Sequence, residues 1–415
     1  MSAYFDALET RSSAEREQAL SQALPAQIRQ AQQHSAAMGR VLKDIDASRV
    51  TSRTELARLP VTRKSELLDL QKASRPADSF GGFAAVVRGP NMPRIFASPG
   101  PIYEPDVAAH DYWRVGRAMH AAGFRAGELV HNAFSYHMTP GAFMMESGAH
   151  AVGCTVFPAG TGQTEQQLAA IADLQPHGYS GTPSFLRILL EKAQEGGINV
   201  SCLKKGLVTG EACPPSLRDW FFAQGVAVSQ CYATADLGLI AYETAAREGL
   251  VIDEGVIVEI VRPGTGDPVP EGEVGELVVT ALNPHYPLVR FGTGDLSAVL
   301  PGTCPTGRSN QRIKGWMGRA DQTTKIKGMF VHPGQVAEVA KRFPQVRRMR
   351  LVVTGEMAND QMTLKVEAEE TAAGLIDRLG EAVRDITKLR SAIELVAPGS
   401  LPNDGKVIED ARSYK

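Results

Sequence analysis

The stretch Leu129-Val-His-Asn-Ala-Phe134 decides the fold class, because it is a short apolar run with the length of one buried strand. Similar runs recur further along the chain, with segments of helical length between them. Residues 163–173 and 183–195 are long enough to serve as crossovers between parallel strands. This alternation predicts an α/β fold. The other strand-like runs are residues 155–157, 206–209 and 227–230.

The regions on either side of this stretch have different patterns. Ser12 with Glu15 three positions later forms a capping box, and the first 70 residues are predicted to be largely helical. Residues 250–299 alternate short apolar runs with turn residues, which predicts a small antiparallel β unit. A compact α+β tail follows, so we expect one domain over residues 1–320 and a second over 321–415. The tail should contain strands at 349–353, 362–366 and 393–396 and a helix at about 371–389.

Composition narrows the class of function. The chain has 415 residues, of which 43% are hydrophobic and 22% charged, as in soluble globular proteins. The formal net charge of −2 provides no positive field to attract nucleic acid or an anionic membrane. We therefore expect a small-molecule function without nucleic acid or membrane partners. The charged N-terminus does not resemble a signal peptide, and no stretch suits a membrane helix, so we expect a cytoplasmic location.

Four short segments carry residue types that suit a nucleotide. Carboxylates accept hydrogen bonds from hydroxyl groups, and arginine and lysine match phosphate oxygens. Each segment is weak alone, because turns and solvated surfaces use the same residues. The segments are Tyr232-Ala-Thr-Ala-Asp236, Arg290-Phe-Gly-Thr-Gly-Asp295, Gly318-Arg-Ala-Asp321 followed by Lys327-Gly328, and Pro402-Asn-Asp-Gly-Lys406.

In this order and at these separations, the segments resemble the adenylate-forming enzyme superfamily, and the flanking sequence is similar to phenylacetate–coenzyme A ligase and its relatives. The resemblance covers nearly the whole chain and implies a large N-terminal adenylation domain with a mobile C-terminal lid. Such enzymes join a carboxylate to the α-phosphate of ATP, expel pyrophosphate, and let the coenzyme A thiol displace AMP. Both steps depend mostly on positioning and charge stabilisation. The flanking matches are residues 4–11, 56–67, 136–158, 181–184 and 326–335.

The resemblance implies a nucleotide site. Asp295 would accept hydrogen bonds from the ribose hydroxyls, Arg319 would reach the ribose or phosphates, and Tyr232 would stack near the adenine. From the residues alone, a solvated turn residue is the less favoured alternative for Asp295. Arg319 could equally be a surface ion-pair partner, and Tyr232 could equally be a core aromatic. The full set of nucleotide-binding residues is Gly210, Glu211, Tyr232, Ala233, Thr234, Asp295 and Arg319.

The remaining matched positions receive roles in the two reaction steps. Lys406 would hold the substrate carboxylate and α-phosphate as charge develops, and Asp236 would act with it as a ligand of Mg²⁺. Asp321 occupies the hinge position, and Lys327 with Gly328 would face the coenzyme A tunnel. The alternative for Lys406 is an ordinary solvated lysine.

An aromatic group after the first strand-like run suggests the acyl pocket. Tyr136 stands where the family places an aromatic residue, and Phe134 and Phe143 are neighbours that would line the same cavity. Such a pocket would suit an arylacetate or a similar ring acid. Plain core packing of the three rings is about equally compatible with the sequence.

Several residues depart from the family pattern. The glycine-rich phosphate loop is replaced by residues 97–105, in which Ser98 and Gly100 remain but prolines remove amide donors and the lysine is missing. Glu104 near the place of that lysine would repel a triphosphate. Ala235 replaces a hydroxyl residue, and Gly292 replaces an arginine beside Asp295. The five cysteines lack a Cys-x-x-Cys pair, so we expect buried thiols and no zinc.

Taken together, the residues predict an ATP-dependent aryl-carboxylate:coenzyme A ligase that uses ATP, Mg²⁺ and coenzyme A with an aromatic or short carboxylic acid. Two alternatives stay open. The acyl group could pass to a carrier protein instead of free coenzyme A, and the altered phosphate loop could mark a protein that binds a nucleotide or acyl-coenzyme A without turnover. Homodimers are common in the resembling family, and a homodimer is a further open alternative.

Overall fold

The computed structural model describes residues 3–320, 322, 324–355, 359–368, 374–402 and 406–412. The chain forms two compact units. The larger consists of Met1–Gly210 and Trp220–Met317, and the smaller of Glu211–Asp219 and Gly318–Lys415. The domain boundary predicted at residue 320 stays a prediction.

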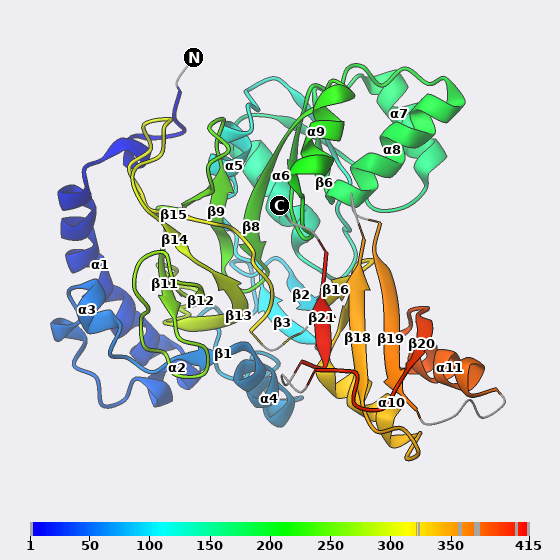
Figure 1. The fold of residues 1–415 in the computed structure, drawn as a ribbon. Helices are drawn as coiled ribbons and strands as arrows, with labels where there is room; N and C mark the ends of the chain where they lie inside the picture. The colour runs from blue at the N-terminus through cyan, green and yellow to red at the C-terminus, as the bar shows by residue number, and fades with distance from the viewer. Residues whose placement is uncertain are drawn as a thin grey trace. The chain divides into compact units, whose positions relative to one another are not determined.

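The predicted α/β alternation forms one large sheet in the larger unit, with the strand order β14-β15-β10-β9-β8-β7-β6-β4-β5. Figure 1 labels β14, β15, β9, β8 and β6 of this sheet. The segment from β5 to β8 is parallel, with Val130 opposite Gly178 and Lys205 opposite Ala227. These strands agree with the runs predicted from sequence, except that β6 was not predicted and β8 extends further. Their bounds are β4 (Leu129–Asn132), β5 (Thr155–Pro158), β6 (Gly178–Gly181), β7 (Lys205–Val208) and β8 (Ala227–Thr234).

Helices connect the parallel strands. The chain passes from β4 to the edge strand β5 through α6, and returns past β4 to β6 through α7. Right-handed crossovers place α6 on one face and α7 with α8 on the other. The direction of winding therefore reverses at β4, and such a switch point is where α/β sheets bind ligands. The helices are α5 (Gly116–Ala121), α6 (Gly141–Ala151), α7 (Thr164–Leu174), α8 (Pro183–Gly196) and α9 (Pro215–Ala223).

Antiparallel strands extend the large sheet and build a second one. The predicted antiparallel region is confirmed, because β11, β12 and β13 pair in the second sheet and β10 joins the first. The bounds are β9 (Gly238–Glu243), β10 (Leu250–Ile252), β11 (Val256–Val261), β12 (Gly275–Ala281), β13 (Phe291–Ser297), β14 (Val299–Leu300) and β15 (Arg312–Ile313).

The N-terminal region is helical as predicted, and α1 begins with the predicted Ser12–Glu15 capping box. One difference is β1, which pairs in parallel with β13 and places Arg63 opposite Gly292. The elements are η1 (Ala7–Thr10), α1 (Ser13–His34), α2 (Ala36–Val41), η2 (Ala47–Arg49), α3 (Arg53–Leu56), β1 (Thr62–Arg63) and α4 (Lys64–Ser74). Among all described helices, none combines the length and apolar character needed to cross a membrane.

Residues 97–105, interpreted from sequence as a phosphate loop, lie within a β-hairpin. Its strands are β2 (Ile95–Ser98) and β3 (Ile102–Pro105), and Ser98 pairs with Ile102. Only residues 99–101 form the turn. The prolines that would interrupt a phosphate loop are compatible with a short two-stranded ribbon, because its edges need few amide donors.

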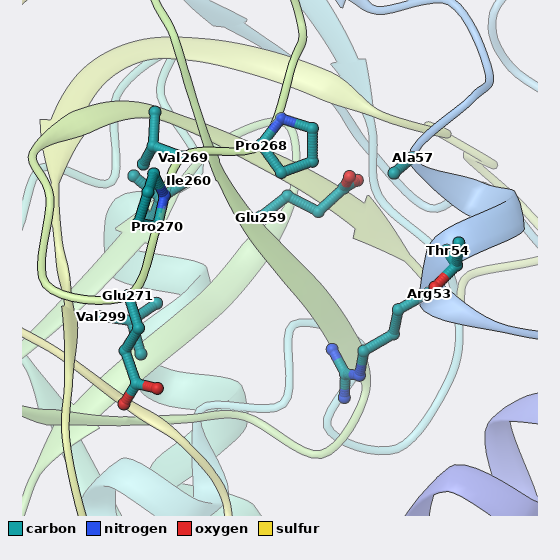
Figure 2. A pocket seen from close by; sticks show the side chains of 10 residues that line it. All are labelled: Arg53, Thr54, Ala57, Glu259, Ile260, Pro268, Val269, Pro270, Glu271 and Val299. Atoms are coloured by element: carbon teal, nitrogen blue, oxygen red, sulfur yellow. The ribbon is translucent and has the colours of Figure 1, made fainter.

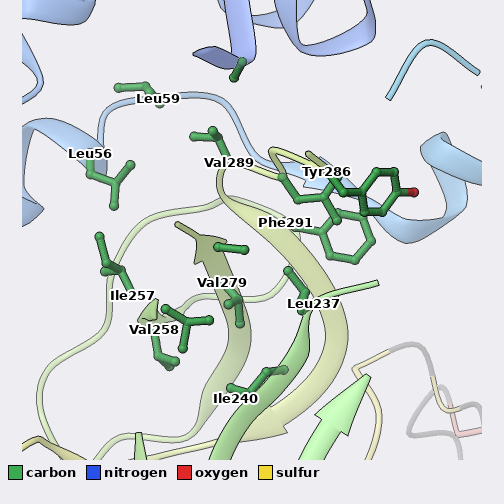
Figure 3. Close-up of a cluster of buried hydrophobic side chains, with 14 of the residues drawn as sticks. Leu56, Leu59, Leu237, Ile240, Ile257, Val258, Val279, Tyr286, Val289 and Phe291 are labelled. Atoms are coloured by element: carbon green, nitrogen blue, oxygen red, sulfur yellow. The ribbon is translucent and has the colours of Figure 1, made fainter. Parts of the chain in front are cut away.

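Apolar side chains from the helices and the second sheet fill the space between them. Figure 3 shows Leu56 and Leu59 packed near Val289, Ile257 and Phe291, all of which are buried. This packing fixes the path of the chain into β1 and α4. It therefore also fixes where the residues at the start of α4 lie relative to β13.

The smaller unit matches the predicted α+β tail. Its main sheet has the order β20-β19-β18-β21 and a core of its own around Leu351 and Leu379. The predicted helix begins at Leu375, and residues 369–373 before it lie outside the described residues. The elements are β16 (Thr324–Ile326), β17 (Met329–Val331), α10 (Pro333–Lys341), β18 (Met349–Thr354), β19 (Gln361–Glu367), α11 (Leu375–Thr387), β20 (Ala392–Val396) and β21 (Ile408–Asp410).

Candidate functional site

The candidate site of the larger unit lies at the carboxyl ends of its parallel strands. Phe134 follows β4, Gly210 follows β7, and Asp236 follows β8. Because neighbouring parallel strands end at the same edge, predicted residues from distant parts of the sequence share one edge of the sheet. The edge also carries the switch point at β4.

Asp295, Tyr232 and Trp316 form a group that we call the Asp295 cluster. The Tyr232 hydroxyl donates to Asp295 Oδ2 at 2.6 Å, and the Trp316 ring nitrogen donates to Asp295 Oδ1 at 3.2 Å. The Asp295 amide donates to Thr293 Oγ1 at 3.1 Å. Each carboxylate oxygen of this half-buried residue thus has a fixed donor.

The local backbone explains how this cluster forms. A register shift between Tyr232 and Ala233 interrupts the pairing of β8 with β9, and such bulges redirect side chains. Two of the predicted nucleotide residues, Tyr232 and Asp295, are therefore in direct contact although they are 63 positions apart. Sequence reasoning missed Trp316, whose only signal is its place two residues before the Gly318-Arg319 motif.

A second group surrounds Asp236 in the β8–β9 turn, and we call Lys64, Ser98, Glu104 and Asp236 the Asp236 cluster. Lys64 Nζ lies 2.5 Å from Asp236 Oδ2, and the Asp236 side chain is 1% exposed while that of Lys64 is 29% exposed. Asp236 Oδ1 is buried with no hydrogen-bond partner among the described residues. Sequence reasoning missed Lys64, whose position at the start of a helix gave no functional signal.

Glu104 belongs to this cluster through charge and burial. The Ser98 hydroxyl donates to Glu104 Oε1, and Glu104 is 2% exposed. Burial, and then repulsion from Asp236, raises the pKa of Glu104 to about 8. At neutral pH Glu104 therefore holds its proton in most molecules, and the repulsion of a triphosphate expected from the sequence is weakened. The Ser98 hydroxyl proton is used in the hydrogen bond to Glu104. The phosphate contact predicted for Ser98 stays a prediction.

The space beside Gly292 is filled by an ion pair between the two strands that flank β13, β1 and β12. A Cβ atom at Gly292 would lie 2.9 Å from Glu276 Oε1 and 3.3 Å from Arg63 Nη1. Arg63 Nη1 is itself 2.5 Å from Glu276 Oε1. The guanidinium that the family pattern places on β13 is thus absent, and an arginine from β1 lies next to the vacant position.

The predicted acyl residues lie together after β4 and at the start of α6. The rings of Tyr136 and Phe143 meet edge to face with centroids 5.2 Å apart, and Phe134 packs partly buried in the same region. Polar partners also occur, because the Tyr136 hydroxyl donates to Glu146 Oε2 at 2.7 Å and accepts from Asn132 at 2.8 Å. Burial and the Glu146 charge raise the pKa of Tyr136, so its proton stays on oxygen.

The smaller unit holds the remaining predicted residues. Lys327 and Gly328 form the exposed two-residue turn between β16 and β17, both with positive φ, as a tight hairpin requires. Lys406 is exposed, and its carbonyl oxygen accepts from Arg350 Nε at 3.1 Å. Arg350 also donates to the Pro402 carbonyl at 3.0 Å, so this buried arginine holds both ends of the Lys406 segment. Sequence reasoning missed Arg350.

Three other predictions have a simpler outcome. Asp321, predicted as the hinge, lies outside the described residues. Arg319 and Glu211 are half-buried members of the smaller unit, and their predicted nucleotide contacts stay predictions. Asp236 Oδ1 fits Mg²⁺, because it is a buried carboxylate oxygen without a hydrogen-bond partner among the described residues. A magnesium ion bound with ATP usually takes one or two carboxylate ligands from the protein and its other ligands from phosphates and water. Within the described ranges, no group of three or more His, Cys, Asp or Glu side chains forms a metal site.

A hollow of about 340 Å³ lies elsewhere in the larger unit, between α3 and the segment after β11 (Figure 2). Arg53, Thr54 and Ala57 line one side, and Pro268 to Glu271 line the other. Glu259 in its wall is already paired with Arg290. None of the site residues predicted from sequence lines this hollow, so it is separate from the candidate site.

Comparison with known proteins supports the assignment of this fold. Residues 110–283 match the model of the AMP-binding enzyme family, and residues 328–411 match that of the AMP-binding enzyme C-terminal domain. The structure resembles that of a 2-hydroxyisobutyryl-CoA ligase in complex with 2-HIB-AMP and CoA, with a TM-score of 0.83, 25% identity, and coverage of 100% of this chain and 93% of that one. These matches define an AMP-forming acid–thiol ligase.

The sequence relatives give the family. The chain is 30% identical over 384 residues to a phenylacetate-coenzyme A ligase of Thermus thermophilus, covering 84% of each chain. It is 32% identical over 346 residues to that of Aromatoleum evansii, covering 80% of this chain and 76% of the relative. The chain belongs to the phenylacetate–coenzyme A ligase family of AMP-binding enzymes. The family, enzyme class and fold class predicted from the sequence are therefore confirmed.

Proposed function

We propose that the protein activates an aromatic carboxylic acid of the phenylacetate type with ATP and transfers the acyl group to coenzyme A. A carboxylate oxygen of the acid bonds to the α-phosphorus as the bond to pyrophosphate breaks. The thiol sulfur of coenzyme A then bonds to the acyl carbon as the bond to AMP breaks, and the thiol proton leaves to solvent. The overall products are acyl-coenzyme A, AMP and pyrophosphate.

The observation that carries this proposal is the hydrogen bond from Tyr232 to Asp295. The family resemblance assigns both residues to the nucleotide, and the fold brings them into direct contact. In this proposal Asp295 accepts hydrogen bonds from the ribose hydroxyls, while Tyr232 and Trp316 fix the orientation of the carboxylate. A preorganised acceptor binds the nucleoside without reorganising first.

Several residues would act on the phosphate and acyl ends. Asp236 Oδ1 would hold Mg²⁺, which supplies charge neutralisation for the phosphates when bound. Lys406 would stabilise negative charge on the carboxylate and α-phosphate, with Arg350 holding its segment. The edge-to-face pair of Tyr136 and Phe143 supports an aromatic acid, because rings pack well against such walls.

The test is AMP release by the purified protein with ATP, Mg²⁺ and a panel of aryl and short acids. Each acid is tried with coenzyme A, with a carrier protein bearing a phosphopantetheine arm, and without an acceptor. We expect AMP release that requires both an aryl acid and coenzyme A, and that falls about 100-fold or more in Lys406→Ala because a charge-stabilising group is removed. The exposed Lys341→Ala on α10 is the matched control and should retain activity.

Other outcomes would change the proposal in defined ways. Release that depends on the carrier protein alone would make the protein a carrier-loading enzyme. Preference for a short aliphatic acid would retain the chemistry but overturn the aryl specificity. Nucleotide binding without AMP release under any condition would contradict the proposal and favour a non-catalytic binding protein.

A further inference from the structure

Lys64 is the accessible positive charge of the Asp236 cluster. It is the first residue of α4, and the packing of Leu56 and Leu59 beneath the preceding segment fixes its position. Its ammonium group is 2.5 Å from Asp236 Oδ2, and its side chain is far more exposed than that of Asp236, at 29% against 1%. An anionic ligand approaching from solvent therefore meets the lysine before it meets the carboxylate.

The surrounding charges require such a cation if a polyphosphate is to bind here. Glu104 and Asp236 are both buried, and residues 97–105 contain no lysine or arginine. Bringing several phosphate charges near a buried carboxylate is unfavourable unless a cation or metal offsets them. A lysine offers a compact charge on a flexible stem, so it can move its contact from a carboxylate to phosphate oxygens.

Resting on the proposed function, we infer that Lys64 binds the β- and γ-phosphates of ATP and the pyrophosphate that they become. It thereby supplies the positive charge that the β2–β3 hairpin lacks. In the absence of nucleotide, Lys64 neutralises Asp236, which would otherwise be a buried carboxylate without a charge partner. With nucleotide bound, the ammonium contacts phosphate, and Asp236 is available to Mg²⁺.

A purely structural ion pair is the competing explanation, and ligand choice separates the two. AMP lacks the β- and γ-phosphates, so a phosphate-binding lysine contributes to ATP and pyrophosphate binding but not to AMP binding. If the lysine only holds Asp236 in place, its removal would lower the stability of the fold or weaken the binding of all three ligands together. The comparison of ATP with AMP therefore distinguishes the roles without requiring turnover.

The experiment measures dissociation constants of ATP, pyrophosphate and AMP by calorimetry, with Mg²⁺ present, for wild type, Lys64→Ala, Lys64→Arg and Lys72→Ala. Lys72 is exposed on the same helix and serves as the matched control. We expect Lys64→Ala to raise the dissociation constants of ATP and pyrophosphate by about tenfold or more, and that of AMP by less than about twofold. Lys64→Arg should recover part of the loss, and Lys72→Ala should equal wild type.

Each result decides the inference. Equal weakening of all three ligands, or unchanged ATP and pyrophosphate affinity in Lys64→Ala, would overturn it, as would a wild-type protein that binds AMP but neither ATP nor pyrophosphate. If Lys64→Ala does not fold, Lys64→Gln, which keeps most of the stem, takes its place with the same criteria. The AMP-release assay on wild type tests the proposed function separately. If wild type releases no AMP while Lys64→Ala binds ATP more weakly and AMP normally, the ligase activity is rejected and the phosphate-binding role of Lys64 is retained.

Discussion

The Asp295 cluster and the Asp236 cluster share the β8–β9 hairpin, yet they are built in opposite ways. At Asp295, the Tyr232 hydroxyl and the Trp316 ring nitrogen donate to a half-buried carboxylate at 2.6 and 3.2 Å. At Asp236, a lysine holds a buried carboxylate at 2.5 Å, with the protonated Glu104 nearby. The first arrangement is suited to neutral hydroxyl groups, and the second to a ligand that brings its own negative charge.

This difference explains which part of the family pattern is preserved in this chain. Ribose hydroxyls need only well-placed acceptors, and the residues that provide them match the pattern. Phosphates need cations and amide donors, and there the loop has become the β2–β3 hairpin with Glu104 facing inward. Under the proposed function, the nucleoside end would use residues that match the family pattern, and the phosphate end would depend on other residues.

Among substitutions in the two clusters, removal of the Asp295 carboxylate should have the largest effect. Asp295→Ala leaves the Tyr232 and Trp316 donors without their acceptor and removes the proposed ribose contact. We expect kcat/KM for AMP release to fall by about 100-fold, because that factor corresponds to the free energy of losing hydrogen bonds to a charged group. Steady-state kinetics measure this, with the exposed turn variant Asp267→Ala as control. Unchanged kinetics in Asp295→Ala would contradict the proposed role of Asp295 in ribose binding.

A smaller effect is expected from Arg350, which lies outside both clusters. Arg350→Lys keeps the charge but cannot hold the Pro402 and Lys406 carbonyl groups together, because lysine lacks the planar fork. We expect kcat for AMP release to fall by about tenfold with KM for ATP within about twofold, as a positioning role predicts. A rise in KM with unchanged kcat would contradict this role.

Tyr232→Phe tests the Asp295 cluster more gently. The substitution keeps the ring but removes the hydroxyl that donates to Asp295. Since one hydrogen bond to a charged group is lost while Trp316 remains, we expect a loss of about 3- to 10-fold in AMP affinity. Fluorescence titration with AMP measures it. Tyr112→Phe, which removes the hydroxyl bonded to Asn283 instead, is the control and should bind AMP normally.

The smallest expected effect is on stability, and it concerns Glu104. Its folded-state pKa of about 8 lies above the usual value of 4.5, so the folded protein holds a proton that the unfolded chain loses. The free energy of unfolding should therefore be highest below about pH 4.5, as far as Glu104 contributes, and fall as the pH rises to about 8.

Glu104→Gln should remove this contribution. At pH 9 we expect Tm to exceed that of wild type by a few degrees, because a pKa raised this far is worth a few kcal/mol and each 1 kcal/mol shifts Tm by about 1 °C in a protein of this size. The difference should be smaller at pH 6. Thermal melts from pH 5 to 9 measure the change, and the exposed Glu338→Gln is the control. An equal Tm difference at every pH would show that Glu104 does not titrate in this range.

Sequence reasoning was strongest where structure is local or periodic. The strands at residues 129–132 and 155–158 agree with their predicted runs, because buried parallel strands are short and apolar. The capping box of α1 also formed where its two residues predicted it. The hairpin at residues 95–105 was missed, because its glycine and prolines are as typical of a loop as of a turn between strands.

Partners in the site could not be predicted in the same way. Lys64 and Asp236 are 172 positions apart, and Arg350 and Lys406 are 56 apart. Nothing in the local pattern around Lys64 or Arg350 distinguishes them from ordinary charged residues. Contacts of this range depend on the path of the whole chain, here on β1 pairing with β13 and on β18 pairing with β21.

The most direct test of the contrast between the two clusters compares ATP with AMP binding in Asp295→Asn and Asp236→Asn, with Mg²⁺ present. We predict that Asp295→Asn weakens the binding of both nucleotides by a similar factor, because both carry the ribose. Asp236→Asn should weaken ATP binding by about tenfold or more and leave AMP affinity within about twofold of wild type. If Asp236→Asn weakened AMP as much as ATP, or if Asp295→Asn left AMP binding unchanged, the division of the site into a nucleoside end and a phosphate end would be wrong.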